Sequence, residues 1–357
     1  MKKIIQVDLG PKKYDVVIQK GLINNLAYEI NKIYNHNKIT VITDENVYAH
    51  FGNIVKEELE KFKFHINFIR VKPGENSKSF EVLKRVYEQL VEFNLTRSDL
   101  IIALGGGVVG DLAGFVASTY LRGVDYIQIP TTLLAQIDSS IGGKVAVNLE
   151  QGKNLVGSFY QPKRVLVDPN VLETLPDKYI KDGLGEIIKY ACIRDAEFFN
   201  MLTLINNKDE FFNNLEHIIY TCVNIKRELV ENDEHDKGER MFLNFGHTLG
   251  HAIEKYFKYE YSHGEAVSLG MYYITRKSEN LGITEKGTTE NIKDLLTNFN
   301  IKYNLPNLNM NKIIDIVLLD KKNISGNFKL ILLNKIGDAF IKSVPIENIK
   351  EFFEGEL

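Results

Sequence analysis

The first half of the chain alternates short apolar runs with stretches in which apolar residues recur every three or four positions. The short runs are rich in Ile, Val and Leu and lie at residues 4–7, 14–18, 38–43, 66–71, 100–104 and 126–129, which predicts β-strands. Between several of them the longer period predicts amphipathic helices, for example over 46–62 and 79–93. Strands that alternate with helices in this way predict a parallel sheet with helices on its faces.

The second half follows the helical period almost throughout, with clear examples at residues 196–204, 210–231 and 265–281. A proline and a helix-start signal at Pro176 and Asp177 mark the change of pattern. We therefore expect an α/β domain over residues 1–176 and a mainly α-helical domain over residues 177–357.

Composition and net charge indicate which kinds of binding partner to expect. The chain has 357 residues, of which 44% are hydrophobic and 25% charged, as expected for a globular protein large enough for two cores. A formal net charge of −3 favours neither nucleic acid nor an anionic membrane as a partner. An anionic ligand would therefore need a local basic pocket.

The two cysteines, Cys192 and Cys222, do not form a Cys-x-x-Cys pair. This excludes a disulfide framework or a thiolate zinc site and indicates a reduced, cytoplasmic protein. Residues 1–8 contain two lysines but no apolar core of signal-peptide length, so we expect no signal peptide. The longest apolar stretch, residues 100–118, contains Asp111 and many glycines, so we expect no membrane span.

A histidine pair in the second half is the first candidate for chemistry. His247 and His251 are four residues apart and lie on one face of a predicted helix, with His263 within folding reach. Glu186 is a lone acid in an apolar run and needs a partner. The spacing predicts a divalent-metal site built on His247 and His251, although histidines spaced in this way are more often ordinary helix residues.

A glycine-rich loop, residues 105–111, follows the predicted strand at 100–104 and leads into a helix-like run. Bare backbone at a helix N-terminus suits a pyrophosphate, so the loop is a candidate dinucleotide site; the alternative is a tight strand-to-helix turn. Asp44 and residues 73–78 follow two other predicted strands, and ligands of open parallel sheets bind beyond such strand ends. Either could instead be a helix cap or a turn.

Two further groups offer ligands for anions. Residues 130–144 and 152–154 supply Thr131, Thr132, Asp138, Lys144 and Lys153, which could hold phosphate or ribose oxygens or form a solvated loop. In the helical half, Arg240 and Asn244 have spacings that place them on the same helical face as His247 and His251. Lys226, taken alone, is expected to be a surface lysine.

Taken together, these motifs resemble the 3-dehydroquinate synthase family of sugar phosphate cyclases. The resemblance runs nearly end to end and rests on residues 105–111, 130–132, 152–155, 185–190, 244–251, 263–267, 320–322 and 330–337. It implies a Rossmann-like, NAD-binding α/β domain followed by a helical metal-binding domain, with the active site in the cleft between them. It also implies a homodimer.

The resemblance assigns the metal ligands differently from the helical spacing. It implies Glu186, His247 and His263 as ligands of Zn²⁺, for which Co²⁺ or iron could substitute, and it directs His251 toward the substrate.

The implied reaction converts 3-deoxy-D-arabino-heptulosonate 7-phosphate to 3-dehydroquinate and phosphate, a step toward aromatic amino acids in the shikimate pathway. It combines transient oxidation by NAD, phosphate elimination, re-reduction and aldol cyclisation, so NAD is regenerated in each turnover.

Site residues follow from the resemblance by position. The implied cofactor contacts are Asp44, Pro73, Gly74, Glu75, Asn76, Ser77, Lys78, Gly107, Val108, Val109, Gly110, Asp111, Thr131, Thr132, Asp138, Lys144, Lys153, Val171, Leu172, Glu173 and Thr174. The implied substrate cage is Lys144, Asn154, Lys189, Lys226, Arg240, Asn244, His251 and Lys321. Arg122 resembles an arginine donated across the dimer, and Asp236 stands where the family usually has Glu.

Three other functions remain open on the sequence. A related cyclase of the 2-deoxy-scyllo-inosose or valiolone type would share fold, NAD and metal, but Lys226, Arg240 and Asn244 together favour a substrate with a carboxylate. A polyol dehydrogenase of the glycerol dehydrogenase type would produce net NADH. A non-catalytic protein that senses NAD or metal is the alternative from another class.

Overall fold

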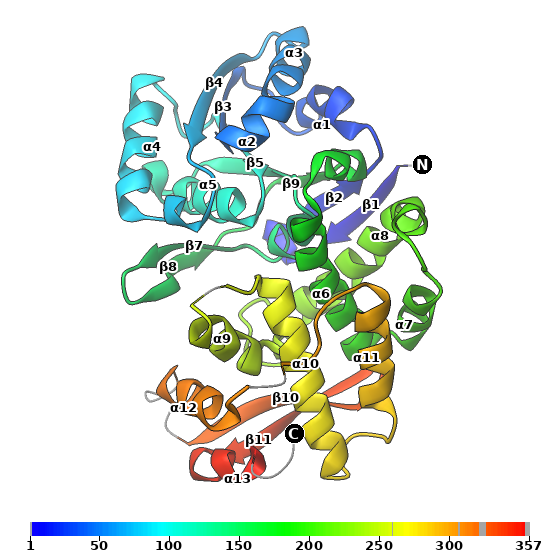
Figure 1. Cartoon of the computed structure of the whole chain (residues 1–357). Coiled ribbons are helices and arrows are strands. Elements are labelled where there is room, and N and C mark those ends of the chain that lie inside the picture. The colour runs from blue at the N-terminus through cyan, green and yellow to red at the C-terminus, as the bar shows by residue number, and fades with distance from the viewer. Residues whose placement is uncertain (1, 259, 306–307, 321–325, 354–357) are drawn as a thin grey trace. The chain divides into compact units, whose positions relative to one another are not determined.

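The computed structural model describes residues 2–258, 260–305, 308–320 and 326–353. The chain forms two compact units (Figure 1): Met1–Ile180 with Leu215–His235, and Lys181–Asn214 with Asp236–Leu357. The domain boundary that we expect after residue 176 stays a prediction. The return of residues 215–235 to the first unit was not expected.

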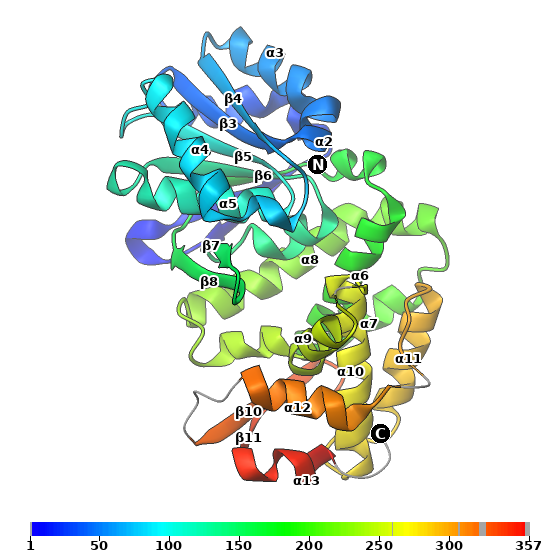
Figure 2. The same ribbon diagram turned by 60° about the vertical axis from the view of Figure 1, so that its left-hand side comes forward.

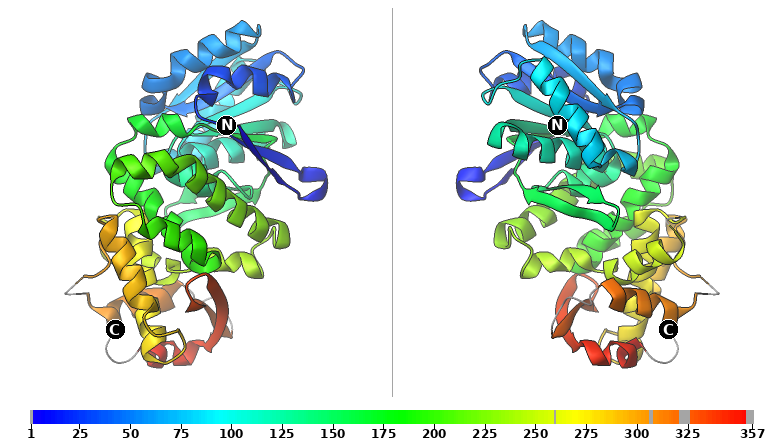
Figure 3. Two further views of the ribbon diagram at one scale, coloured as in Figure 1. Left: turned by 90° about the vertical axis from the view of Figure 1, so that its right-hand side faces the viewer. Right: turned by 90° about the vertical axis from the view of Figure 1, so that its left-hand side faces the viewer.

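The first unit is built on a seven-stranded sheet in the order β1-β2-β9-β6-β5-β3-β4. Its strands are β1 (Lys3–Val7), β2 (Tyr14–Ile18), β3 (Lys38–Asp44), β4 (His65–Val71), β5 (Leu100–Gly105), β6 (Asp125–Pro130) and β9 (Arg164–Val167). All neighbouring pairs from β2 to β4 are parallel, and only β1 pairs antiparallel, with β2. Figure 3 shows this antiparallel pair in dark blue. The predicted parallel sheet is confirmed, and all six predicted strands are present.

Helices of the first unit cover the sheet (Figure 2). They are α1 (Leu26–Asn31), α2 (Glu45–Val47), α3 (Asn53–Lys61), α4 (Phe80–Glu92) and α5 (Gly107–Thr119). The apolar stripe of α4, with Leu83, Val86 and Leu90, packs in one core with Leu112 and Val116 of α5 and the inward side chains of β3 and β5. Strand β5 is buried along its whole length, as expected for a central parallel strand.

The first unit also contains a separate hairpin of β7 (Lys144–Leu149) and β8 (Gly152–Phe159), which the sequence pattern did not predict. Most residues of β8 are exposed or half-buried, so the segment lacks the apolar run by which the sheet strands were found. Strand β9 was missed because it has only four residues.

The second unit is mainly helical, as predicted. Its helices are α6 (Asp177–Arg194), α7 (Ala196–Thr203), the start of α8 (Lys208–Asn232), α9 (His247–Tyr256), α10 (His263–Asn280), α11 (Thr288–Asn298), α12 (Met310–Asp320) and α13 (Ile349–Phe353). Helix α6 begins in the first unit, and α8 continues into the first unit from Leu215 onward. An antiparallel pair that was not predicted, β10 (Asn327–Lys335) and β11 (Asp338–Pro345), completes the unit. Within the described ranges, no helix is long and apolar enough to span a membrane.

Candidate metal centre and active site

The crossing of α6 and α10 places an acid beside a histidine. A Cβ atom on Gly264 would lie 2.0 Å from the backbone oxygen of Asp182, and one on Gly185 would lie 2.4 Å from that of Gly264. Only glycine allows the two backbones to come this close. The Asp182 carboxylate also accepts a hydrogen bond of 2.5 Å from the Gly264 N–H. Glu186, next to Gly185, is thereby brought to His263 at the start of α10.

A second close contact positions α9 against α10. Gly246, just before α9, has a left-handed φ of 77°, and a Cβ on Gly270 of α10 would lie 2.0 Å from its backbone oxygen. The turn at Gly246 makes His247 the first residue of α9. Two glycine contacts therefore bring residues from three helices together.

Glu186, His247 and His263 form a compact cluster. Oε1 of Glu186 lies 3.5 Å from Nε2 of His247 and 3.5 Å from Nε2 of His263, and the three ligand atoms lie within 4.8 Å of one another. Two atoms that are each about 2.1 Å from a tetrahedral zinc ion are about 3.4 Å apart. The spacing of the cluster therefore fits a single divalent ion.

Both histidine rings present Nε2 to Glu186 because Nδ1 faces another acceptor. Nδ1 of His247 lies 3.1 Å from the backbone oxygen of Phe245, and Nδ1 of His263 lies 3.7 Å from Oε1 of Glu254. An Nδ1–H that points to an oxygen leaves the Nε2 lone pair for a metal.

The charges in the cluster are strongly coupled. Burial alone would raise the pKa of Glu186, but Lys189, which forms an ion pair with it, and the two histidines hold that pKa well below its usual range. Burial lowers the pKa of His247 to about 3, against the attraction of Glu186. Burial would also lower the pKa of His263, but the Glu186 and Glu254 carboxylates outweigh it and raise the pKa to about 10.

The donor set fits a divalent metal. The Glu186 carboxylate is 1% exposed; its Oε2 forms the ion pair with Lys189, and its Oε1 faces Nε2 of both histidines. One carboxylate and two imidazoles suit zinc or a similar ion and leave coordination positions open for a substrate.

His251, Glu254 and His263 form a second cluster with metal-ligand spacing. It uses the same His263 ring, and a neutral imidazole offers a lone pair on only one nitrogen. The buried carboxylate of Glu186, whose Oε1 faces Nε2 of both His247 and His263, favours the first cluster. The rings of His247 and His251 are 5.3 Å apart, but His251 does not belong to the Glu186 cluster. The ligand set that the resemblance implies stays a prediction.

The residues expected in the substrate cage have varied environments. Lys189 and Arg240 are almost wholly buried, each 1% exposed, whereas Asn244, His251, Lys144 and Asn154 are exposed. Arg122 is exposed and has a φ of 67°, and Asp236 has a φ of 59°. Lys321 lies outside the described residues.

The structure contradicts two expectations about these residues. Lys226 is not a surface lysine: it is 5% exposed, its Nζ donates to the backbone oxygen of Asp138 at 2.7 Å, and it forms an ion pair with the Asp138 carboxylate. Arg240 and Asn244 do not share one helical face with His247 and His251. They lie in the 3-10 helix η8 (Glu239–Asn244), which the left-handed turn at Gly246 separates from α9.

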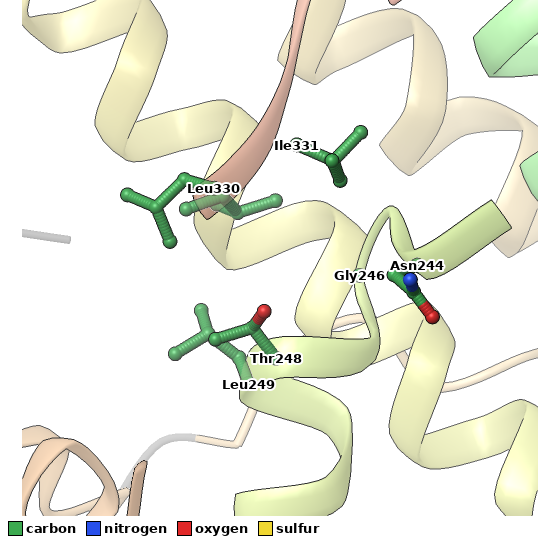
Figure 4. Close-up of a pocket in the computed structure, with 7 residues that line it drawn as sticks. Asn244, Gly246, Thr248, Leu249, Leu330 and Ile331 are labelled. Atoms are coloured by element: carbon green, nitrogen blue, oxygen red, sulfur yellow. The ribbon is translucent and has the colours of Figure 1, made fainter. Parts of the chain in front are cut away.

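A small hollow lies beside this turn (Figure 4). Asn244, Gly246, Thr248, Leu249, Ile274, Leu330 and Ile331 line it. None of these seven side chains carries a charge, so the hollow is unsuited to an anionic substrate.

The glycine loop of the first unit ends β5 and begins α5, as predicted. Its glycines are also required for packing: a Cβ on Gly106 would lie 2.9 Å from Cγ2 of Thr132, and one on Gly110 would lie 2.7 Å from Oε1 of Gln128. A strand-to-helix turn therefore accounts for part of the motif, and contact with a dinucleotide stays a prediction.

Other residues assigned to the cofactor also have structural roles. Asp44 caps α2 by accepting from the N–H groups of Asn46 and Val47 at 2.9 and 3.0 Å. Oγ1 of Thr132 accepts from the N–H of Ala135 at 3.2 Å. Residues 171–174 belong to the 3-10 helix η7 (Pro169–Thr174), and residues 75–77 form the 3-10 helix η4 (Glu75–Ser77).

Lys78 lies at the centre of a polar network. It is 3% exposed, and its Nζ lies 2.6 Å from Oδ2 of Asp111 and contacts Oδ1 of Asn154. Burial raises the pKa of Asp111, and Lys78 opposes that shift. The network joins residues assigned to the cofactor, Lys78 and Asp111, to one assigned to the substrate, Asn154.

Three residues near these clusters were missed by sequence reasoning. Asp182 precedes Glu186 by one helical turn, and Glu254 follows His251 by three residues, so their helical spacing was a usable signal. Asn148 gave no such signal, because its partners come from other elements.

Solved structures of sugar phosphate cyclases are similar to the chain over nearly its whole length. A 2-deoxy-scyllo-inosose synthase complexed with carbaglucose-6-phosphate, NAD+ and Co2+ is 25% identical with a TM-score of 0.87, covering 98% of this chain and all of its own. ValA, a 2-epi-5-epi-valiolone synthase from Streptomyces hygroscopicus subsp. jinggangensis 5008 with NAD+ and Zn2+ bound, is 25% identical with a TM-score of 0.83, and 95% of each chain is covered.

Sequence comparison is more specific. The family models described as 3-dehydroquinate synthase N-terminal and 3-dehydroquinate synthase C-terminal match residues 68–182 and 183–323. A 3-dehydroquinate synthase from Clostridium botulinum (strain Alaska E43 / Type E3) is 56% identical over 351 residues, which are 98% of this chain and 100% of the relative. By these matches, the chain belongs to the 3-dehydroquinate synthase family.

Proposed function

We propose that the chain converts 3-deoxy-D-arabino-heptulosonate 7-phosphate to 3-dehydroquinate and phosphate, with NAD and a divalent metal as cofactors. Family membership supports the reaction. The cluster of Glu186, His247 and His263 is the observation that carries the metal-dependent mechanism, since its 3.5 Å spacings and buried carboxylate fit one ion.

Glu186, His247 and His263 would hold the metal, and the loops after β3, β4, β5 and β6 would hold NAD. When bound, NAD supplies a transient hydride acceptor for the substrate carbinol, and the ion polarises the hydroxyl that is oxidised. Similar proteins crystallised with NAD+ and Co2+ or Zn2+ support this cofactor pair.

The remaining residues bind and orient the substrate or move protons. The exposed ring of His251 lies 5.3 Å from that of His247 and 5.8 Å from that of His263, close enough to exchange protons with a substrate held at the cluster. The residues proposed to bind the carboxylate and phosphate of the substrate are Lys144, Asn154, Lys189, Lys226, Arg240, Asn244 and Lys321. Lys189 and Lys226 are held in place by Glu186 and Asp138, so their ammonium groups are fixed before the substrate arrives.

We also propose a cytoplasmic homodimer in which Arg122 reaches the partner's site. The exposure of Arg122 and its left-handed backbone are compatible with that role. Both cysteines are buried and form no disulfide, which suits a reducing compartment. Asp236 is proposed to take the place of the usual glutamate of the family.

One experiment separates this function from its rivals. The purified, zinc-loaded protein is incubated with the heptulosonate phosphate and one equivalent of NAD⁺, and phosphate release and NADH absorbance are followed. Because the hydride returns to the substrate, we expect many phosphates per NAD⁺ and at most sub-stoichiometric NADH. Consumption of one NAD⁺ per phosphate would indicate a dehydrogenase.

The same assay with glucose 6-phosphate tests the cyclase rival. Faster phosphate release from glucose 6-phosphate than from the heptulosonate phosphate would assign the chain to the 2-deoxy-scyllo-inosose type. If the protein bound NAD but released phosphate from neither substrate, a non-catalytic protein would be favoured.

A further inference from the structure

Asn148 of β7 is a half-buried residue that has no role in the mechanism above. Its Nδ2 donates to Oε1 of Glu75 at 2.8 Å, and its Oδ1 accepts from the backbone N–H of Asn154 at 2.8 Å. Its own backbone N–H donates to the backbone oxygen of Lys78 at 2.7 Å. Its three partners are all residues assigned to the cofactor or the substrate.

An irregularity of the β7–β8 hairpin explains why Asn154 needs a side-chain partner. Val147 pairs with Val156 and Leu149 pairs with Gly152, so β8 has extra residues between the two pairs. Asn154 lies in this bulge with a φ of 57°. Its N–H is outside the ladder register and would otherwise lack an acceptor from the paired strand. The side chain of Asn148 supplies that acceptor.

The contacts close into a ring of Glu75, Lys78, Asn148 and Asn154, which we call the polar ring. Oδ1 of Asn154 accepts from Nζ of Lys78, and the same Nζ lies 3.6 Å from Oε1 of Glu75. The Lys78 side chain is 4% exposed. A desolvated ammonium strengthens the hydrogen bonds around it and makes an incomplete ring costly.

We infer that Asn148 is a positioning residue that fixes the Asn154 amide and couples it to the loop of Glu75. The inference rests on the proposed function, in which Glu75 contacts NAD and Asn154 contacts the substrate. Because one side-chain amide bonds to both residues, a change at Glu75 alters the free energy of holding Asn154 in place. Cofactor and substrate binding are then linked through Asn148, and such linkage is reciprocal.

Hydrogen exchange at the Asn154 amide tests the positioning role without any turnover. Asn148→Ala removes the acceptor, so exchange of that amide should become at least about tenfold faster, the scale of one lost hydrogen bond. Asn148→Asp keeps an acceptor and should protect the amide better than Asn148→Ala does. Gln151→Ala, in the exposed turn of the same hairpin, is the control and should exchange as wild type.

NAD is the probe for the coupling. Adding NAD should slow Asn154 exchange in the wild type and should have no such effect in Asn148→Ala. Unchanged exchange in Asn148→Ala would overturn the positioning role. An equal effect of NAD in wild type and variant would overturn the coupling.

Kinetics provide a second readout. Asn148→Ala should raise KM for the heptulosonate phosphate about tenfold with a smaller change in kcat, because a binding group is released and no reacting group is lost. Asn148→Asp places a carboxylate against Glu75 and should weaken NAD binding as well.

In the double variant Asn148→Asp with Glu75→Gln, the new amide at position 75 can donate to the new carboxylate at position 148, the reverse of the wild-type hydrogen bond. The double variant should therefore have a lower KM for the heptulosonate phosphate than Asn148→Asp alone. No improvement would contradict the link through Glu75. If the wild type released no phosphate, the proposed function would fail, while the exchange experiment would still decide whether Asn148 positions Asn154.

Discussion

At the scale of single residues, the candidate metal site depends on side chains that are not among its proposed ligands. Glu254 is 8% exposed and faces Nδ1 of His263, whose Nε2 faces Glu186. An acid in this position selects the ring tautomer and fixes the ring plane. Carboxylates behind a ligating histidine typically contribute about tenfold to 100-fold to metal affinity.

We therefore predict that Glu254→Ala weakens zinc binding by about tenfold or more, measured by competition with a chromophoric chelator. Glu254→Gln should lie between Ala and wild type, since its amide oxygen still accepts from Nδ1–H without the charge. Glu260→Gln, an exposed acid in the loop after α9, serves as the matched control. Wild-type zinc affinity in Glu254→Ala would show that the 3.7 Å contact has no effect on the ion.

At the scale of elements, sequence pattern identified what is buried and regular. Five of the six predicted sheet strands pair in parallel, and such strands read as apolar runs because both faces of the sheet are covered. The sixth, β1, pairs antiparallel with β2 and was found from its short apolar run. The β7–β8 hairpin was missed because every residue of β8 is exposed or half-buried and β7 has a buried run of only three residues. The prediction that Arg240 and Asn244 share a helical face with the histidines was wrong. Helical spacing assumes a continuous helix, and the left-handed φ of 77° at Gly246 interrupts it.

The contact between α6 and α10 leads to a prediction at this scale. Gly264→Ala would place a methyl group 2.0 Å from the Asp182 backbone oxygen, so the helices must separate. We expect loss of stoichiometric zinc, measured by atomic absorption, because His263 moves away from Glu186. Gly185→Ala, which adds a methyl on the opposite helix, should act in the same way. Full zinc content in both variants would show that the close contact does not determine the ligand geometry.

At the scale of the whole molecule, the ligand set joins positions 186, 247 and 263, which are far apart in the sequence. Local spacing predicts only pairs on one helix, and so it selected His247 with His251. Resemblance to a family supplied Glu186 and His263, and the structure brings these residues together with His247. Local sequence pattern also could not predict that Lys226 is buried, because its ion-pair partner, Asp138, lies in a distant segment of the chain.

The two compact units divide the expected cofactors between them. Residues assigned to NAD lie at or before residue 174 and belong to the first unit, whereas Glu186, His247 and His263 belong to the second. Each group should therefore bind without the other. Removal of the metal should destabilise the second unit, because the ion would no longer hold Glu186, His247 and His263 together, and it should leave the loops of the first unit unchanged.

We predict that EDTA treatment abolishes phosphate release and lowers the melting temperature, while the Kd for NAD, measured by equilibrium dialysis, changes less than about threefold, under about 0.7 kcal/mol. Adding zinc back should restore both turnover and thermal stability, since a ligand that binds only the folded state shifts the unfolding equilibrium in its favour. A tenfold or larger loss of NAD affinity on chelation would mean that the metal organises the cofactor site as well. The division of labour between the two units would then be wrong, even if the ligand set were correct.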